Sequence, residues 1–104
     1  MVTVKQNDSE KLIERKLVEL VTSCGGMCIK LLSDYITGLP DRLCLFPGRI
    51  AIFVELKSTG KKPRKIQVFM HNKLRALGFR VEVIDTIEGV KNFIESLQTD
   101  ANRK

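Results

Sequence analysis

Two apolar runs on either side of a tight turn constrain the fold of this chain more than any other feature. Residues 42–46 read RLCLF, residues 50–56 read IAIFVEL, and the PGR sequence of residues 47–49 separates them. Proline and glycine suit a tight turn, and both runs are rich in residues that favour strands. We therefore predict a β-hairpin. Because its strands would fold back about residue 48, Asp41 is expected to lie opposite Glu55.

Periodic apolar residues outside this hairpin predict an alternating chain of helices and strands. The predicted helices span residues 9–23, 65–77 and 87–97, and the further strands span residues 27–32 and 80–84. Ser9 is a fair N-cap for the first helix, and glycine and proline break residues 33–41 into a loop. The order is α-β-β-β-α-β-α, which indicates an α/β fold with a mixed central sheet.

The length of 104 residues corresponds to one domain, so we expect residues 1–104 to form one unit with its core at about residues 9–97. The polar N-terminus does not resemble a signal peptide, and no apolar run could cross a membrane. A cytoplasmic location with no membrane partner is therefore expected. Three cysteines, Cys24, Cys28 and Cys44, lack a second pair of metal ligands nearby, and we interpret them as small apolar residues.

Positive charge is concentrated in one segment of the chain. The formal net charge is +6, and residues 57–65 (KSTGKKPRK) contain five basic side chains and no acidic one. These side chains are Lys57, Lys61, Lys62, Arg64 and Lys65. A local cluster of this kind is typical of a surface that contacts phosphates, although a solvated loop has the same composition. Nucleic acid is therefore the first candidate partner.

An acidic pair and a lysine meet at the ends of the predicted hairpin strands. Glu55 and Lys57 are two apart on one strand and so point to the same side, with Leu56 facing the other way. An E-x-K triplet alone is most often a surface ion pair, but Glu55 interrupts a strongly apolar run. Side by side, Asp41 and Glu55 would repel each other unless a hard divalent cation compensated them. The backbone carbonyl of Leu56 is a further candidate ligand, and Lys57 is placed to orient the attacking water or to neutralise a phosphate transition state.

The order and spacing of several motifs resemble a known nuclease family. The motifs are GLPDR at residues 38–42, FVELK at 53–57, GKKP at 60–63, Gln67, LRALGF at 74–79 and the strand at 81–85. Together they resemble the VRR-Nuc domain of the PD-(D/E)xK nuclease superfamily, over about residues 9–97 of this chain. The resemblance implies a restriction-endonuclease-like core and a stand-alone domain of the phage or bacterial type.

The resemblance also implies the roles of four residues. Asp41 and Glu55 would be ligands of Mg²⁺ or Mn²⁺, and Lys57 would be the catalytic lysine. Gln67, at the start of the following helix, would be a further active-site residue.

The family further places a glutamate on the first helix. Glu10 is preferred here as a catalytic residue and metal ligand, and Glu14, on the same helix face, is the alternative. Either could instead be a solvated carboxylate. Lys30 and Arg42 resemble phosphate contacts and would join Lys61, Lys62, Arg64 and Lys65 in binding DNA, with ordinary surface charges as the alternative reading.

Stand-alone members of the family resemble structure-selective nucleases that act as homodimers on four-way DNA junctions. A two-fold dimer supplies the two symmetric cuts that resolution of a junction needs. The apolar face of the first helix and that of the hairpin are the two candidate interfaces. The resulting hypothesis is an Mg²⁺- or Mn²⁺-dependent endonuclease that hydrolyses branched DNA. Alternatives are a nuclease for flaps, single strands or RNA, a non-catalytic DNA-binding module, and an interaction protein with an acidic partner.

Overall fold

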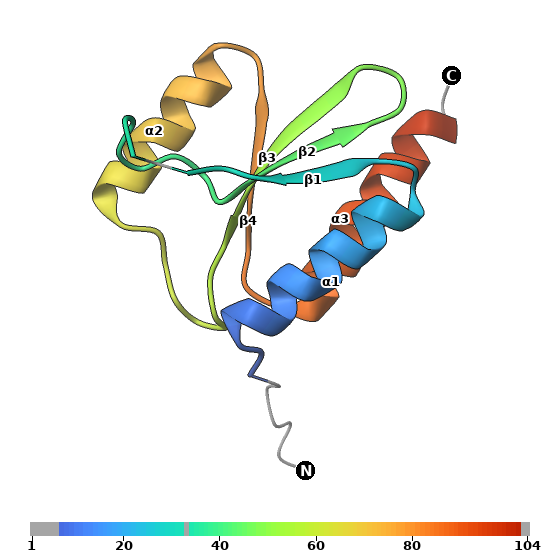
Figure 1. Cartoon of the computed structure of the whole chain (residues 1–104), viewed down its shortest axis with the longest axis horizontal. Coiled ribbons are helices and arrows are strands. Elements are labelled where there is room, and N and C mark those ends of the chain that lie inside the picture. The colour runs from blue at the N-terminus through green and yellow to red at the C-terminus, as the bar shows by residue number, and fades with distance from the viewer. Residues whose placement is uncertain (1–6, 33, 103–104) are drawn as a thin grey trace.

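The chain folds in the predicted order of helices and strands (Figure 1). The computed structural model describes residues 7–32 and 34–102. Its elements are α1 (Glu10–Ser23), β1 (Met27–Lys30), β2 (Arg42–Phe46), β3 (Ile50–Leu56), α2 (Lys65–Ala76), β4 (Arg80–Ile84) and α3 (Ile87–Asn102). Ser33 of the predicted loop, and residues 1–6 and 103–104 of the polar termini, lie outside the described residues.

The four strands form one mixed sheet in the order β1-β2-β3-β4. β2 is antiparallel to both of its neighbours, β1 and β3, and β4 pairs with β3 in parallel. In the hairpin, Phe46 pairs with Ile50 and Arg42 pairs with Val54, so the predicted register is confirmed. The turn between them depends on Gly48, whose φ of 88° is a left-handed conformation that costs glycine little.

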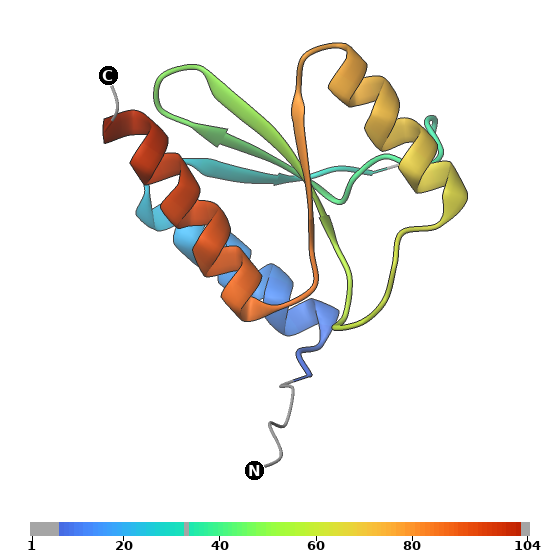
Figure 2. The ribbon, with the colours of Figure 1, turned by 180° about the vertical axis from the view of Figure 1, so that it is seen from behind.

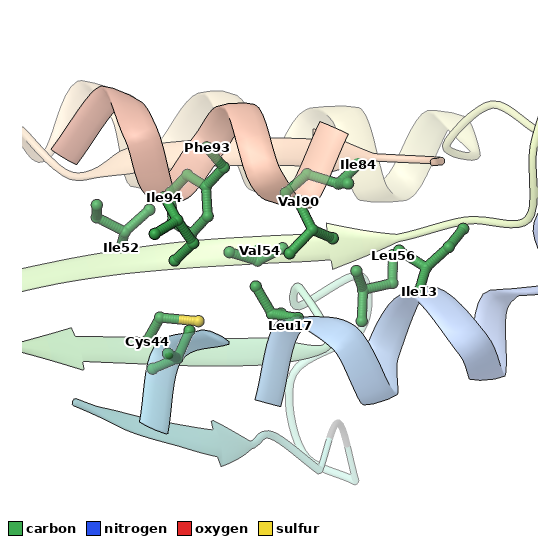
Figure 3. Packing of buried hydrophobic residues seen from close by; sticks show 11 residues of the cluster. Ile13, Leu17, Cys44, Ile52, Val54, Leu56, Ile84, Val90, Phe93 and Ile94 are labelled. Carbon is green, nitrogen blue, oxygen red and sulfur yellow. The ribbon is translucent and has the colours of Figure 1, made fainter. Parts of the chain in front are cut away.

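Helices cover the two faces of the sheet. The views in Figures 1 and 2 show α1 and α3 side by side on one face and α2 on the other. Ser9 is the N-cap of α1, and its side chain accepts a hydrogen bond from the Leu12 N–H. The buried stripe of the helix consists of Ile13, Leu17 and Val21. This stripe packs with apolar side chains of α3 and of β2 to β4 (Figure 3).

The packing of α1 corrects one expectation about a dimer. Ile13, Leu17 and Val21 are fully buried within the chain's own core. The apolar face of the first helix is therefore already covered, and the expectation that it could form a dimer interface is wrong.

Two element boundaries differ from the predicted ones by more than one residue. The first strand ends at Lys30 rather than at residue 32, and Leu32 is 75% exposed. The last helix runs to Asn102 rather than to residue 97, since neither glycine nor proline interrupts the chain there. Among the described residues, no helix is long and apolar enough to cross a membrane.

The three cysteines are free thiols, and Cys24 is the C-cap residue of α1. Cys28 on β1 pairs with Cys44 on β2, and their sulfur atoms lie 3.9 Å apart. Cys44 is fully buried among apolar residues of the core, as expected for a small apolar side chain.

Candidate active site

The C-terminal end of β3 holds a buried acid beside a lysine. Glu55 Oε2 lies 3.6 Å from Lys57 Nζ, and the two side chains are 1% and 17% exposed. Leu56, between them, points to the opposite side and joins the core with α1 and α3. The predicted alternation along this strand is therefore confirmed, and it places the Glu55 carboxylate on the side of the sheet that α2 covers.

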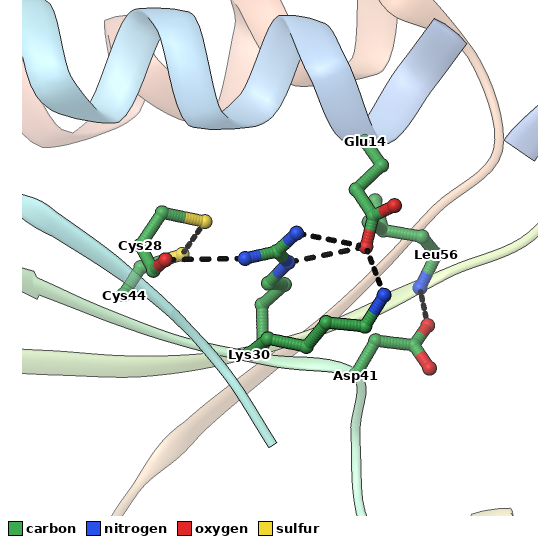
Figure 4. Close-up of polar contacts among 7 residues, drawn as sticks. Glu14, Cys28, Lys30, Asp41, Cys44 and Leu56 are labelled. Carbon is green, nitrogen blue, oxygen red and sulfur yellow. Dashed lines mark hydrogen bonds and ion pairs between the residues drawn. The ribbon is translucent and has the colours of Figure 1, made fainter. Parts of the chain in front are cut away.

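Asp41 is fixed against the same end of β3. Its Oδ2 accepts a hydrogen bond of 2.8 Å from the Leu56 N–H (Figure 4). The preceding loop reaches this point by passing close over α2: a Cβ on Gly38 would lie 2.6 Å from the carbonyl oxygen of Ile66. Gly38 also has a φ of 87°, so glycine suits this position for two reasons. The loop thus delivers the second carboxylate beside Glu55.

Burial and charge together alter the ionisation of Glu55. The pKa of Glu55 is raised to about 8: burial is the largest cause, the neighbouring Asp41 carboxylate also raises it, and Lys57 acts in the opposite direction. Two neighbouring carboxylates disfavour each other's ionised form. A cation placed between Asp41 and Glu55 would remove that penalty.

Gln67, in the first turn of α2, connects the helix to Glu55. Its Nε2 donates to Glu55 Oε2 at 3.3 Å, and its Oε1 accepts from the Arg64 N–H at 2.8 Å. The second bond satisfies a backbone N–H at the helix N-terminus, which otherwise has no partner within the helix. Gln67 is 7% exposed, and the structure brings it into contact with Glu55.

His71 is a residue of this site that the sequence analysis missed. Its Nε2 lies 3.5 Å from Glu55 Oε1, and the side chain is buried. His71 follows Gln67 by four residues on a helix, and such residues share a face. That spacing was the signal available in the sequence.

On α1, Glu14 rather than Glu10 makes the contacts. Glu14 Oε2 accepts from Arg42 at 3.1 Å and lies 3.8 Å from Lys30 Nζ (Figure 4). Arg42 is further held by the Cys28 carbonyl at 3.2 Å. Glu10 is exposed in the first helical turn and makes no side-chain hydrogen bond or ion pair with another described residue. Thus Lys30 and Arg42, expected to contact phosphates, are paired with an acid in this structure.

The basic loop follows Lys57 directly and is anchored at its base. The Thr59 N–H donates to the Asp8 carbonyl at 3.1 Å, and Thr59 Oγ1 donates to the Asp85 carbonyl at 2.7 Å. The Gly60 N–H adds a bond of 3.0 Å to Asp85 Oδ2. Four exposed basic side chains follow, and within the described part of the chain none is in an ion pair: Lys61, Lys62, Arg64 and Lys65.

The donor atoms at this site suit a hard divalent cation. Over residues 7–32 and 34–102, no three His, Cys, Asp or Glu side chains are gathered as a metal cluster. Mg²⁺, however, is commonly bound by one or two carboxylates, with water and substrate phosphates completing its shell. Asp41 and Glu55 supply two carboxylates, and Glu55 Oε1 has no hydrogen-bond partner among the described residues. The residues present therefore fit such an ion.

The chain is similar to a phage protein and to a solved structure. It is 43% identical over 77 residues to the protein named "Putative nuclease p44" of Acyrthosiphon pisum secondary endosymbiont phage 1, covering 74% of this chain and 83% of that protein. A solved structure described as "VRR_NUC domain" superposes with a TM-score of 0.78 at 28% identity, covering 85% of this chain and 97% of the other. No protein-family model matches the sequence.

Proposed function

Because the chain belongs to the VRR-Nuc family of nucleases, we propose that it is a metal-dependent endonuclease that hydrolyses phosphodiester bonds in branched DNA. The observation that carries this proposal is the convergence of Asp41, Glu55 and Lys57 at one end of the hairpin. A protein that only bound DNA would gain nothing from two neighbouring carboxylates, because they repel phosphate. The same carboxylates suit a site that binds Mg²⁺ or Mn²⁺ and the scissile phosphate together.

The roles of the residues follow from their positions. Asp41, Glu55 and the Leu56 carbonyl would hold the ion, which when bound lowers the pKa of a water molecule and polarises the phosphate. Lys57 is partly exposed beside Glu55. Its ammonium is therefore placed to orient the attacking water and to stabilise the negative charge that develops on the phosphate oxygens.

Glu14 is the better candidate for the acid on the first helix. It lies against Arg42 and Lys30, whereas Glu10 points to solvent one helical turn earlier. In this arrangement Glu14 orients the side chains of Arg42 and Lys30 near the proposed metal ligands. An incoming phosphate could compete with Glu14 for either cation, and the freed carboxylate could then face the ion.

Action on four-way (Holliday) junctions by a homodimer is the finer part of the proposal. One chain offers one candidate site, and symmetric resolution of a junction needs two. Since the apolar stripe of α1 is buried, the hairpin remains the candidate interface. Leu43 and Leu45 are half-buried on β2 and point to the face of the hairpin opposite to core residue Cys44.

A cleavage panel tests the proposal. The purified protein is incubated with linear duplex, flap, fork and four-way junction DNA, with Mg²⁺, with Mn²⁺ and with EDTA. We expect cleavage of the junction with either ion and none with EDTA. Equal cleavage of all substrates would contradict branch selectivity, and cleavage in EDTA would contradict the metal requirement. The Asp41→Asn variant, which loses one ligand charge, should bind the junction without cutting it.

A further inference from the structure

A buried contact joins the single histidine of the chain to Glu55. The Nε2 of His71 lies 3.5 Å from Glu55 Oε1, and each residue is 1% exposed. Among the described residues, these are also the two buried side-chain atoms that lack a hydrogen-bond partner. Unsatisfied buried polar atoms are rare because they are costly. Because the two atoms lie within 3.5 Å of each other, one proton donated from Nε2 to Oε1 would satisfy both of them.

The geometry of α2 extends this contact into a two-point support. Gln67 Nε2 reaches Glu55 Oε2 at 3.3 Å, which leaves Oε1 to His71 one helical turn later. We infer that His71 is a positioning residue, which donates a hydrogen bond from Nε2 to Oε1 of Glu55 and fixes the carboxylate in its metal-binding orientation. This inference rests on the proposed metal-dependent function.

The imidazole ring can supply the donor that this role needs. A neutral ring carries one N–H and brings no charge that would compete with the cation for Glu55. Hydrogen bonds that neighbouring residues donate to metal ligands commonly orient those ligands and increase metal affinity.

The tautomer of His71 gives the first test, and it needs neither metal nor substrate. Because the chain has one histidine, a ¹⁵N-labelled sample yields a single pair of imidazole nitrogen signals. We expect the proton on Nε2 and none on Nδ1 in the metal-free protein. A bare Nε2 would overturn the inference, because that atom could then only accept a proton or bind the metal itself.

Three substitutions give the second test, read as Mn²⁺ affinity by calorimetry without DNA. His71→Leu fills the space but removes the donor, and we expect it to weaken Mn²⁺ binding about 10–100-fold. His71→Gln retains an amide donor of similar reach and should restore most of the affinity. His71→Asn has a shorter side chain and should not. Melting temperatures without Mn²⁺ are compared to establish that each variant is folded.

The outcomes separate this inference from the function on which it rests. Wild-type protein that binds Mn²⁺ no better than His71→Leu overturns the inference alone. If His71→Leu does not fold, equal affinities of His71→Gln and His71→Asn overturn it in the same way. Wild-type protein that neither binds Mn²⁺ nor cuts DNA overturns the proposed function and, with it, the inference. Cleavage by His71→Leu should also recover at high Mn²⁺, whereas cleavage by Lys57→Ala should not.

Discussion

Lys57 is the residue whose loss should separate catalysis from binding most clearly. Its ammonium is 3.6 Å from Glu55 and partly exposed, so it can reach a phosphate without being a metal ligand. We predict that Lys57→Ala lowers the cleavage rate by about 10²–10⁴-fold, the range for loss of one acid–base or charge-stabilising group. Binding of junction DNA, measured in Ca²⁺, should persist.

Lys91→Ala provides the matched control for that substitution. Lys91 is an exposed lysine on α3, and α3 covers the opposite face of the sheet from α2. The Lys91→Ala substitution removes the same charge far from the site, and the variant protein should cut DNA at the wild-type rate. Full activity of a clean Lys57→Ala preparation would remove Lys57 from the mechanism.

Glu10 and Glu14, the two candidate site acids on α1, lead to opposite predictions. Glu14 contacts Arg42 and Lys30, whereas Glu10 is exposed. Glu14→Gln should therefore weaken Mn²⁺ binding and cleavage about 10–100-fold, and Glu10→Gln should leave both near wild type. Melting temperatures of both variants control for the lost Arg42 contact. Loss of activity in Glu10→Gln with normal activity in Glu14→Gln would restore the original preference.

At the scale of elements, Asp8 ties three segments together ahead of α1. Its Oδ2 accepts from the Ile87 N–H at 2.8 Å, and its backbone N–H donates to Thr59 Oγ1 at 2.8 Å. The buried carboxylate thus satisfies the N-terminus of α3, and its backbone anchors the basic loop. An N–H at a helix N-terminus needs such a partner, and a carboxylate there also suits the helix dipole.

We predict that Asp8→Ala lowers the free energy of unfolding by about 1–3 kcal/mol, the cost of leaving a buried group without its hydrogen bond. Urea denaturation measures this change. Asp8→Asn is the matched control, because an amide oxygen can still accept from Ile87 N–H, and it should lose less. Equal losses in the two variants would show that the acceptor oxygen contributes little.

The sequence predicted the elements because their signals are local. Alternating apolar residues and the turn at residues 47–49 identified the hairpin, and its register then placed Asp41 opposite Glu55. The packing of α1 is not local. Glu10 and Glu14 share a helix face, and four residues advance about 6 Å along the axis. Only tertiary packing decides which of the two turns lies over the ends of the strands.

His71 was missed for a related reason. Its four-residue spacing from Gln67 placed both on one face of a helix, but many helix positions satisfy that spacing. No local pattern in the sequence indicates that this face of α2 covers the Glu55 carboxylate, because α2 and β3 come into contact only in the folded chain.

At the scale of the whole molecule, the basic loop is expected to bind DNA through phosphates. Lys61 and Lys62 are exposed and, among the described residues, have no acidic partner, so DNA can displace their counterions freely. We predict that replacing either lysine with glutamine reduces the magnitude of the slope of log K, the DNA association constant, against log salt concentration by about 0.9. Fluorescence anisotropy in Ca²⁺ at several salt concentrations measures this slope. Lys91→Gln should leave it unchanged, and an equal reduction there would show only an effect of net charge.

The proposed dimer makes a prediction about how two cuts are coupled. A supercoiled plasmid with an extruded cruciform loses its junction once one nick releases the supercoiling. A dimer with two sites can make the second cut before it dissociates, so wild-type protein should give linear plasmid directly.

Mixing wild-type protein with excess Lys57→Ala protein should form dimers with one working site, and nicked circular plasmid should then accumulate. Dilution with buffer alone should keep the linear product, provided the dimer persists at that concentration. A product ratio unaffected by Lys57→Ala would mean that each chain cuts independently, because no inactive partner then shares the junction.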